Sequence, residues 1–340
     1  MWGCPSHVNQ FLQHFVLKRI GRSVLQPRGK TVTDKNNFDL LRLLFASAVG
    51  LVHASDLSGF QQLEWIAASL SSVVAVKAFF VISGFLIFMS FERSTSLMSY
   101  ARKRIQRIYP AYLTVILLCA IGLSAVSSSS LSEYFSFSWL RYVAGNLVFL
   151  NFLQPTLSGV FGSNIVPTVN GVLWTLKIEV LFYFSVPLLV FLIRQFAPFA
   201  VLAFIYILSV AYGSLLTWVA SQTGSSMYLE LARQLPGQLS YFTAGAFFYY
   251  FLPLFQRRRF YFLTGAVLVL IVNRFFSLPL LEPFALATVV VFFGLLCYVG
   301  NIGKFGDFSY GIYILHFPII QLCCMLAGLT KAPGIFFLPS

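Results

Sequence analysis

Residues 70–91 read LSSVVAVKAFFVISGFLIFMSF, a run of 22 residues with one charged side chain, Lys77. A helix crosses the hydrocarbon core of a bilayer with roughly 20 predominantly apolar residues. This stretch has that length and that composition. Within lipid a helix satisfies its own backbone hydrogen bonds, whereas an isolated strand leaves them unpaired. The stretch therefore predicts a transmembrane helix.

Similar stretches recur along all 340 residues, of which 58% are hydrophobic and 10% charged. A soluble domain typically carries about 25% charged residues. The chain is therefore predicted to be all-α, a polytopic transmembrane helix bundle of nine or ten spans. The short aromatic segment 139–153 is interpreted as an interfacial or re-entrant part of the long loop 128–173. The nine expected spans are 39–57, 70–91, 109–127, 174–194, 198–219, 235–255, 260–276, 281–299 and 308–329.

The positive residues are unevenly divided between the two sides of these spans. Sixteen of the 23 Lys and Arg lie on the side of the N-terminus, four on the other side and three within spans. By the positive-inside rule, the N-terminus is expected in the cytoplasm of a plasma (bacterial inner) membrane. Residues 1–37 are then a basic cytoplasmic tail without a cleaved signal peptide. Residues 38–330 form the transmembrane domain, and 331–340 are a C-terminal tail or the start of a truncated tenth span. The net charge of +13 thus indicates orientation in the membrane rather than a nucleic-acid partner.

Two ionisable residues lie on the first expected span, Arg42 and His53. Eleven residues correspond to about three helical turns and a rise of about 16 Å, so the two side chains share a face. Charges within a bilayer are costly and usually functional. Arg42 alone is compatible with a side chain that reaches the lipid headgroups, and His53 with an interfacial histidine. Their common face favours a shared polar pocket.

Glu179 lies on the fourth expected span, within LWTLKIEVLFY (173–183). A buried carboxylate requires a cationic partner. Lys177 is about 200° away around the helix, so an Arg or His of another span is expected to pair with Glu179. On the second span, Lys77 is interpreted as reaching the outer headgroups. Ser83–Gly84 is small enough for close helix packing.

Two further stretches contain candidate binding residues. The stretch YARKRIQRIYPAY (100–112) places Arg104 and Arg107 three residues apart, where both can face one anion. Orientation in the membrane and contact with anionic lipids explain the same charges. In the last span, Tyr313 and His316 share a face, as catalytic-pocket residues or as part of an interfacial aromatic belt. The five cysteines lack the spacing of a metal site, and no metal is expected.

Taken together and in order, these stretches resemble the acyltransferase 3 family of membrane O-acyltransferases. Arg42 and His53 match its arginine-x10-histidine pair, and FFVISGF (79–85) its second-helix motif. RIQRIYP (104–110) matches its R-x-x-R-I-x-P signature. Residues 174–183 match W-[ST]-L-x-x-E-x-x-F-Y, and residues 309–316 match S-Y-x-x-Y-x-x-H.

The resemblance implies an enzyme that uses acetyl-CoA or another acyl-CoA to O-acylate a glycan or lipid-linked saccharide. It implies that His53 is catalytic with Arg42 as its pocket partner, and that Arg104 and Arg107 contact coenzyme A. Our hypothesis for the catalytic site is direct transfer with His53 as the base, in a pocket that Arg42 or Glu179 organises. The substrate pocket is assigned to Ser83, Trp174, Tyr313 and His316. The chain departs from the family pattern at Lys77, a position that is often acidic or neutral, and in the missing tenth span.

A transporter or flippase is the alternative, with buried Arg, His and Glu as a relay for substrate or ions. The sequence shows neither an inverted repeat nor paired broken helices, which such proteins often contain. A purely structural scaffold leaves the charges within the membrane unexplained. Neither the acceptor, the acyl length, the choice between direct transfer and an acyl-enzyme, nor the oligomeric state follows from the sequence.

Overall fold

The computed structural model describes residues 35–300, 303 and 308–328, and in this part of the chain it contains helices and no strands. The predicted all-α class is confirmed. Most of the proposed N-terminal tail and all of 331–340 lie outside the described residues. The α-helices are α2 (Phe38–Ser58), α3 (Glu64–Ser69), α4 (Ser72–Glu92), α5 (Leu97–Gly122), α6 (Leu131–Tyr134), α7 (Phe137–Leu147), α8 (Leu173–Gln195), α9 (Pro198–Thr223), α10 (Ser226–Ala232), α11 (Leu235–Tyr250), α12 (Leu252–Asn273), α13 (Glu282–Leu295) and α14 (Phe308–Leu326).

The protein is a multi-pass membrane protein, although fewer helices than expected have full spanning length. Among the described residues, six helical segments are long and apolar enough to cross a bilayer. They are α2, α4 with the short helices before it, α5 with the turn after it, α8, α9 and α14. The other three expected spans coincide with α11, of 16 residues, α13, of 14 residues, and α12. α12 is interrupted at Arg258, whose backbone is not helical.

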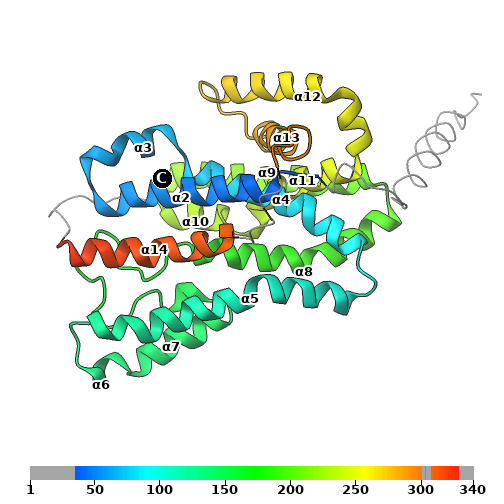
Figure 1. The fold of residues 1–340 in the computed structure, drawn as a ribbon. Coiled ribbons are helices and arrows are strands. Elements are labelled where there is room, and N and C mark those ends of the chain that lie inside the picture. The colour runs from blue at the N-terminus through cyan, green and yellow to red at the C-terminus, as the bar shows by residue number, and fades with distance from the viewer. Residues whose placement is uncertain (1–34, 301–302, 304–307, 329–340) are drawn as a thin grey trace, which may run out of the picture.

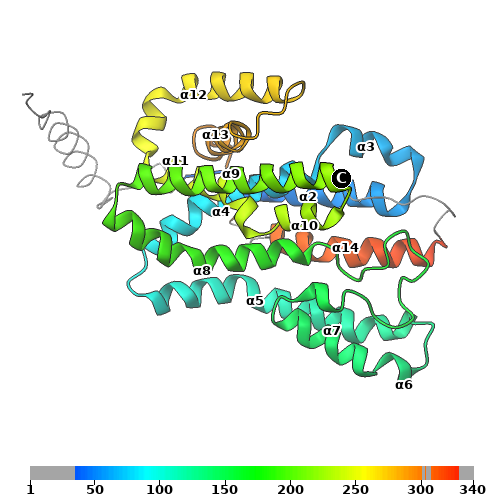
Figure 2. The same cartoon turned by 180° about the vertical axis from the view of Figure 1, so that it is seen from behind.

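The helices form layers, as Figures 1 and 2 show from opposite sides. α5 and α7 lie at one flank and α12 at the other. α8 and α14 lie next to α5, and α2, α4, α9 and α11 form the centre of the bundle. α13 is seen nearly end-on between α12 and this central group, so it crosses the other helices. The helices that carry the predicted site residues, α2, α4, α5, α8 and α14, therefore lie in the middle of the bundle and on the side away from α12.

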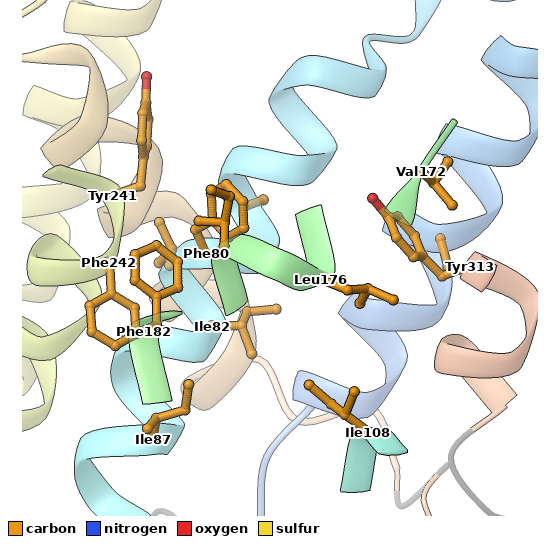
Figure 3. Close-up of a cluster of buried hydrophobic side chains, with 14 of the residues drawn as sticks. Phe80, Ile82, Ile87, Ile108, Val172, Leu176, Phe182, Tyr241, Phe242 and Tyr313 are labelled. Atoms are coloured by element: carbon orange, nitrogen blue, oxygen red, sulfur yellow. The ribbon is translucent and has the colours of Figure 1, made fainter. Parts of the chain in front are cut away.

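The closest helix contact is between α4 and α11, and it depends on two glycines. A Cβ built on Gly84 would overlap the carbonyl oxygen of Phe242, and one built on Gly245 would overlap that of Val81. Small residues allow such close approach between membrane helices. The prediction for Ser83–Gly84 is thus confirmed. The Phe242 ring then stacks on Phe182 of α8, with ring centroids 4.1 Å apart (Figure 3).

The basic stretch 100–112 is helical throughout, although most of it lies between the expected spans 70–91 and 109–127. α5 begins at Leu97, after Ser96, whose hydroxyl accepts a hydrogen bond from the backbone N–H of Ser99. Such a cap satisfies an amide that has no partner within the helix. The signature residues and the third span therefore belong to one continuous helix. In the loop 128–173, the segment interpreted as interfacial or re-entrant contains the helix α7.

Lys77 has an ionic partner within the bundle. Its ammonium lies 3.2 Å from Oε1 of Glu282, at the start of α13, and 5.0 Å from the centre of the Tyr241 ring. The Tyr241 hydroxyl donates a hydrogen bond to the same carboxylate over 2.5 Å. Burial of a lysine between helices is tolerated when its charge is paired in this way. Lys77 thus joins α4 to α13, in contrast to the expected contact with outer headgroups.

Candidate functional site

A pocket between five helices contains several of the residues that the sequence singles out as candidates for the site. The pocket is open on one side, and its cavity volume is about 50 Å³. α2, α4, α5, α8 and α14 contribute to its wall. The lining residues are Arg42, Val76, Phe79, Phe80, Ser83, Arg107, Ile108, Thr175, Leu176, Glu179, Ser309, Tyr310 and Tyr313.

The pocket has two guanidinium groups and one carboxylate. Arg42 is buried and forms an ion pair of 3.7 Å with Asp39, one turn earlier on α2. Arg107 also lines the pocket, and its side chain is exposed. Oε1 of Glu179 accepts a hydrogen bond of 2.6 Å from the Tyr183 hydroxyl, one turn later on α8. The pocket therefore combines an excess of positive charge with a carboxylate held in a fixed position.

The start of two helices adds to this positive character. Thr175 lies in the first turn of α8 and Ser309 in the first turn of α14, and both line the pocket. The N-terminal end of a helix carries a partial positive charge because its first backbone N–H groups have no partners within the helix. Two such ends beside two arginines favour a negatively charged ligand.

Asn37 fixes the start of α2 and thereby the position of Arg42. Its side chain donates to the carbonyl oxygens of Phe293 and Cys297 at the end of α13, over 2.9 and 2.5 Å. Its side-chain oxygen accepts from the backbone N–H of Val299 over 2.9 Å. These bonds satisfy carbonyl groups that the end of a helix leaves unpaired. α2 is thus held against α13 little more than one turn before Arg42.

The two membrane histidines lie outside the lining of this pocket and contact each other. His53 Nδ1 of α2 is 2.9 Å from His316 Nε2 of α14. The Tyr313 ring lies between them and the pocket, since its centroid is 5.9 Å from that of His316 and its hydroxyl is 2.8 Å from Thr175 Oγ1. The shared pocket expected for Arg42 and His53 is therefore not what the structure shows: Arg42 lines the pocket, and His53 lies outside its lining, with the Tyr313 ring in contact with both the pocket and His316.

Comparison with known proteins agrees with this arrangement. The model of the acyltransferase 3 family, described as an acyltransferase domain, matches residues 35–338. The chain belongs to the acyltransferase 3 family. This match covers every helix that the structure describes, including all the predicted site residues.

Two curated relatives of this acyltransferase 3 protein are similar to it. Nodulation protein 10 of Rhizobium leguminosarum bv. viciae is 34% identical over 201 residues, which cover 55% of this chain and 51% of that protein. The O-acetyl transferase of Shigella phage Sf6 is 29% identical over 173 residues, which cover 51% of each protein. The matched part thus spans about half the length of these relatives. No solved structure matches the chain.

Five of the nine predicted site residues of this acyltransferase 3 protein line one pocket: Arg42, Ser83, Arg107, Glu179 and Tyr313. His53 and His316 form the neighbouring pair. Trp174 packs against the apolar core and is not among the lining residues. Throughout the described ranges, no group of three or more His, Cys, Asp and Glu side chains is placed to hold a metal ion.

Arg104 is not among the residues that line the pocket containing Arg107. Its Nη2 donates to Ser90 Oγ over 3.1 Å, and its guanidinium lies 5.6 Å from the centre of the Tyr183 ring. Its Nε is buried without a hydrogen-bond partner. Residues three apart on a helix differ by about 60° in direction, which is enough to give Arg104 and Arg107 different neighbours. The expectation that both face one anion remains a prediction.

Several residues near the site were not predicted. Tyr183, the partner of Glu179, lies in the matched motif at the i,i+4 spacing, so this pair could have been found from the sequence. Asn164, Asn170 and Gln321 attach the long loop to α14, and their partners are distant in sequence. Asn170 Nδ2 donates to the Ile314 carbonyl over 2.9 Å, and Asn164 Nδ2 donates to Gln321 Oε1 over 2.9 Å. No local pattern indicates these contacts.

Proposed function

We propose that this protein is a membrane-embedded acyltransferase that transfers an acyl group from acyl-CoA to a hydroxyl of a glycan or lipid-linked saccharide. The observation that carries the proposal is an electropositive pocket of five helices beside a half-buried pair of imidazoles in contact with each other. The family membership supports acyl transfer, and the relative from phage Sf6, an O-acetyl transferase, favours acetyl as the acyl group. The glycan or lipid-linked saccharide acceptor is the one that the resemblance to the family implies.

The phosphates of coenzyme A are proposed to bind at Arg107, the exposed arginine of the pocket. A guanidinium matches the oxygen geometry of a phosphate and forms charge-assisted hydrogen bonds with it. Arg104 is the second proposed contact because it lies one turn away, and its Nε has no partner. The basic residues of α5 favour delivery of the donor from the cytoplasm. The long pantetheine arm would then place the thioester deeper between the helices.

His53 is proposed to act as the general base. Its imidazole is half-buried, and the unprotonated nitrogen of a neutral imidazole can accept the proton of a hydroxyl. His53 takes the proton of the acceptor hydroxyl while the hydroxyl oxygen forms a bond with the thioester carbonyl carbon. The carbon–sulfur bond then breaks, and the thiolate of coenzyme A leaves and takes up the proton. Arg42 and Glu179 organise the pocket in which the charged donor is held.

The test is acetylation of a saccharide acceptor by purified protein with labelled acetyl-CoA. His53→Ala is expected to lower kcat by about 10²–10⁴-fold, the usual contribution of a general base. Arg107→Ala is expected to raise the KM for acetyl-CoA more than it lowers kcat, since it removes a contact with the part of the donor that does not react. Arg102→Ala is the matched control, an exposed arginine on the same helix that is not among the lining residues.

Wild-type acetylation by His53→Ala would remove His53 from the proposed mechanism. Equal effects of Arg107→Ala and Arg102→Ala would contradict the donor site. A transporter gives a different result: reconstituted protein moves the saccharide across the membrane without acetyl-CoA, and no label is transferred. Measurement of uptake and label in the same vesicles separates these two functions.

A further inference from the structure

His53 of α2 and His316 of α14 are 263 residues apart in sequence, and their side chains are in contact. The rings are stacked, with centroids 5.2 Å apart, and the Phe317 ring packs edge-on against His53 at 5.6 Å. Both histidines are half-buried. Two imidazoles in such surroundings require a definite arrangement of protons, because each neutral ring offers one donor and one acceptor nitrogen.

The second nitrogen of His316 defines that arrangement. His316 Nδ1 lies 3.2 Å from the carbonyl oxygen of Ile312, one turn earlier on α14. A carbonyl oxygen only accepts, so Nδ1 of His316 carries the hydrogen and Nε2 of the neutral ring is an acceptor. His53 Nδ1 must then carry the hydrogen that it donates to His316 Nε2. This assignment follows from the hydrogen-bond network.

The consequence concerns the remaining nitrogen of His53. With the hydrogen on Nδ1, Nε2 of the neutral ring holds a free lone pair. Within the described part of the chain, Nδ1 is the nitrogen of His53 that makes a hydrogen bond to another residue. The nitrogen that can take a proton is therefore Nε2, on the side of the ring away from His316.

We propose that His316 is a positioning residue of the transfer reaction, which accepts the Nδ1–H of His53 and so keeps Nε2 of His53 available as the base. This inference rests on the proposed function, in which His53 takes the proton of the acceptor hydroxyl. A base oriented by a third group is a recurring arrangement in acyl transfer. Here the third group is a neutral imidazole.

The pair also acts during the reaction. As the acceptor oxygen bonds to the carbonyl carbon, its proton moves to His53 Nε2 and His53 becomes an imidazolium. Its Nδ1–H then donates a charge-assisted hydrogen bond to His316 Nε2, which is stronger than the bond between two neutral rings. When the carbon–sulfur bond breaks, the Nε2 proton passes to the thiolate sulfur of coenzyme A. His53 returns to its initial tautomer, and no proton is gained or lost by the pair.

The position of His316 is itself fixed by α14 and its neighbours. A Cβ built on Gly50 of α2 would lie 3.6 Å from the His316 ring, so α2 and α14 are in contact at this level. Asn170 holds the carbonyl of Ile314 over 2.9 Å, two residues before His316. His316 thus belongs to a segment that is attached on two sides, as a positioning residue requires.

Two substitutions of His316 separate positioning from simple packing. His316→Gln keeps a side-chain oxygen that can accept the Nδ1–H of His53, whereas His316→Phe keeps a ring that cannot accept. We expect His316→Phe to lower kcat by about 10–100-fold, as loss of an orienting partner typically does, with an unchanged KM for acetyl-CoA. His316→Gln should retain more activity than His316→Phe. A packing role predicts the opposite order, because Phe preserves the ring and Gln does not.

The tautomer gives a second measurement that does not depend on activity. The chain has four histidines, so ¹⁵N-histidine labelling of the full protein in membranes gives few signals, and His53→Ala identifies those of His53. The ¹⁵N shifts of the wild type should show a protonated Nδ1 and an unprotonated Nε2 for His53. In His316→Phe the Nε2–H tautomer should increase. Unchanged tautomer populations in His316→Phe overturn the proposal.

The two levels of the hypothesis fail in different ways. If His53→Ala is active, the proposed function of His53 is wrong, and His316 has no catalytic base to position. If His53→Ala is inactive while His316→Phe has the wild-type kcat, His53 remains the base and only the role of His316 is contradicted. The thermal midpoints of both His316 variants, compared with the wild type, identify a loss of activity that comes from unfolding.

Discussion

At the scale of single residues, one tyrosine and one asparagine side chain compensate for prolines within helices. Pro187 lacks the N–H that would bond the carbonyl of Tyr183, four residues earlier on α8. The Tyr100 hydroxyl of α5 donates to that carbonyl over 3.1 Å. Pro318 likewise leaves the Ile314 carbonyl without its helical donor, and Asn170 supplies one. In lipid an unpaired carbonyl is especially costly, because no water replaces the missing donor.

Removal of the Tyr100 hydroxyl should therefore destabilise the protein. We expect Tyr100→Phe to lower the free energy of unfolding by about 1–3 kcal/mol, the cost of a buried acceptor left unpaired. Denaturant titration of the detergent-solubilised wild type and variant measures this difference in the free energy of unfolding. Tyr261→Phe is the matched control, since Tyr261 is 76% exposed and its hydroxyl makes no hydrogen bond to the described residues. Equal effects of both substitutions would contradict the explanation.

A double-mutant cycle tests the link to the proline. In Pro187→Ala, the new backbone N–H can bond the Tyr183 carbonyl and restore the helical pattern. In the Pro187→Ala background, Tyr100→Phe should lower the free energy of unfolding by only about 0.5 kcal/mol or less. The two substitutions should therefore be non-additive, as expected for residues that share one hydrogen-bond partner. If Tyr100→Phe costs the same in the Pro187→Ala variant as in the wild type, the hydroxyl stabilises the protein for a reason unrelated to the missing N–H.

At the scale of helices, positions were predictable from sequence and partners were not. Each expected span coincides with a helix because apolar length is a local property. Arg42 and Glu179 were identified as candidate residues from the sequence because charged side chains within lipid are costly and usually functional. The ion pair of Lys77 with Glu282 and the contact of His53 with His316 connect distant segments. Such contacts depend on how the helices cross, and no periodicity of one helix determines that.

The contact between α4 and α11 yields an element-scale prediction. Gly84→Ala places a Cβ where the carbonyl of Phe242 lies, and a backbone cannot move aside as a side chain can. We expect a loss of about 1–3 kcal/mol in the free energy of unfolding, the usual cost of overpacking. Gly245→Ala should behave alike, because it meets the carbonyl of Val81.

The matched control is Gly213→Ala, within α9. A Cβ there meets nothing within 4 Å. Alanine is favoured over glycine in a helix by about 0.8–1.0 kcal/mol, so the same substitution should be neutral or stabilising. Opposite signs at Gly84 and Gly213 support close packing as the cause. A Gly84→Ala variant as stable as the wild type would show that the two helices separate at little cost.

At the scale of the whole molecule, charge and shape give the bundle two unlike ends. α4 and α8 end together, where Arg194 lies 3.2 Å from the carboxylate of Glu92, and the basic part of α5 begins nearby. The opposite end carries α3 and α6 (Figure 1). The sixteen-to-four distribution of Lys and Arg predicts that the first end faces the cytoplasm. Arg107 would then receive a cytoplasmic donor, while the saccharide approaches the imidazole pair from the other side.

Labelling of single cysteines tests this orientation. Arg102→Cys and Ser132→Cys are both exposed and lie toward opposite ends of α5 and its following loop. In a variant whose five native cysteines are replaced, an impermeant maleimide added to intact spheroplasts should label Ser132→Cys. It should label Arg102→Cys only after the membrane is permeabilised, because the basic end faces inward. The reverse pattern would place Arg107 on the outer side, where acyl-CoA is not delivered, and would remove the proposed route of the donor even if the pocket itself binds coenzyme A.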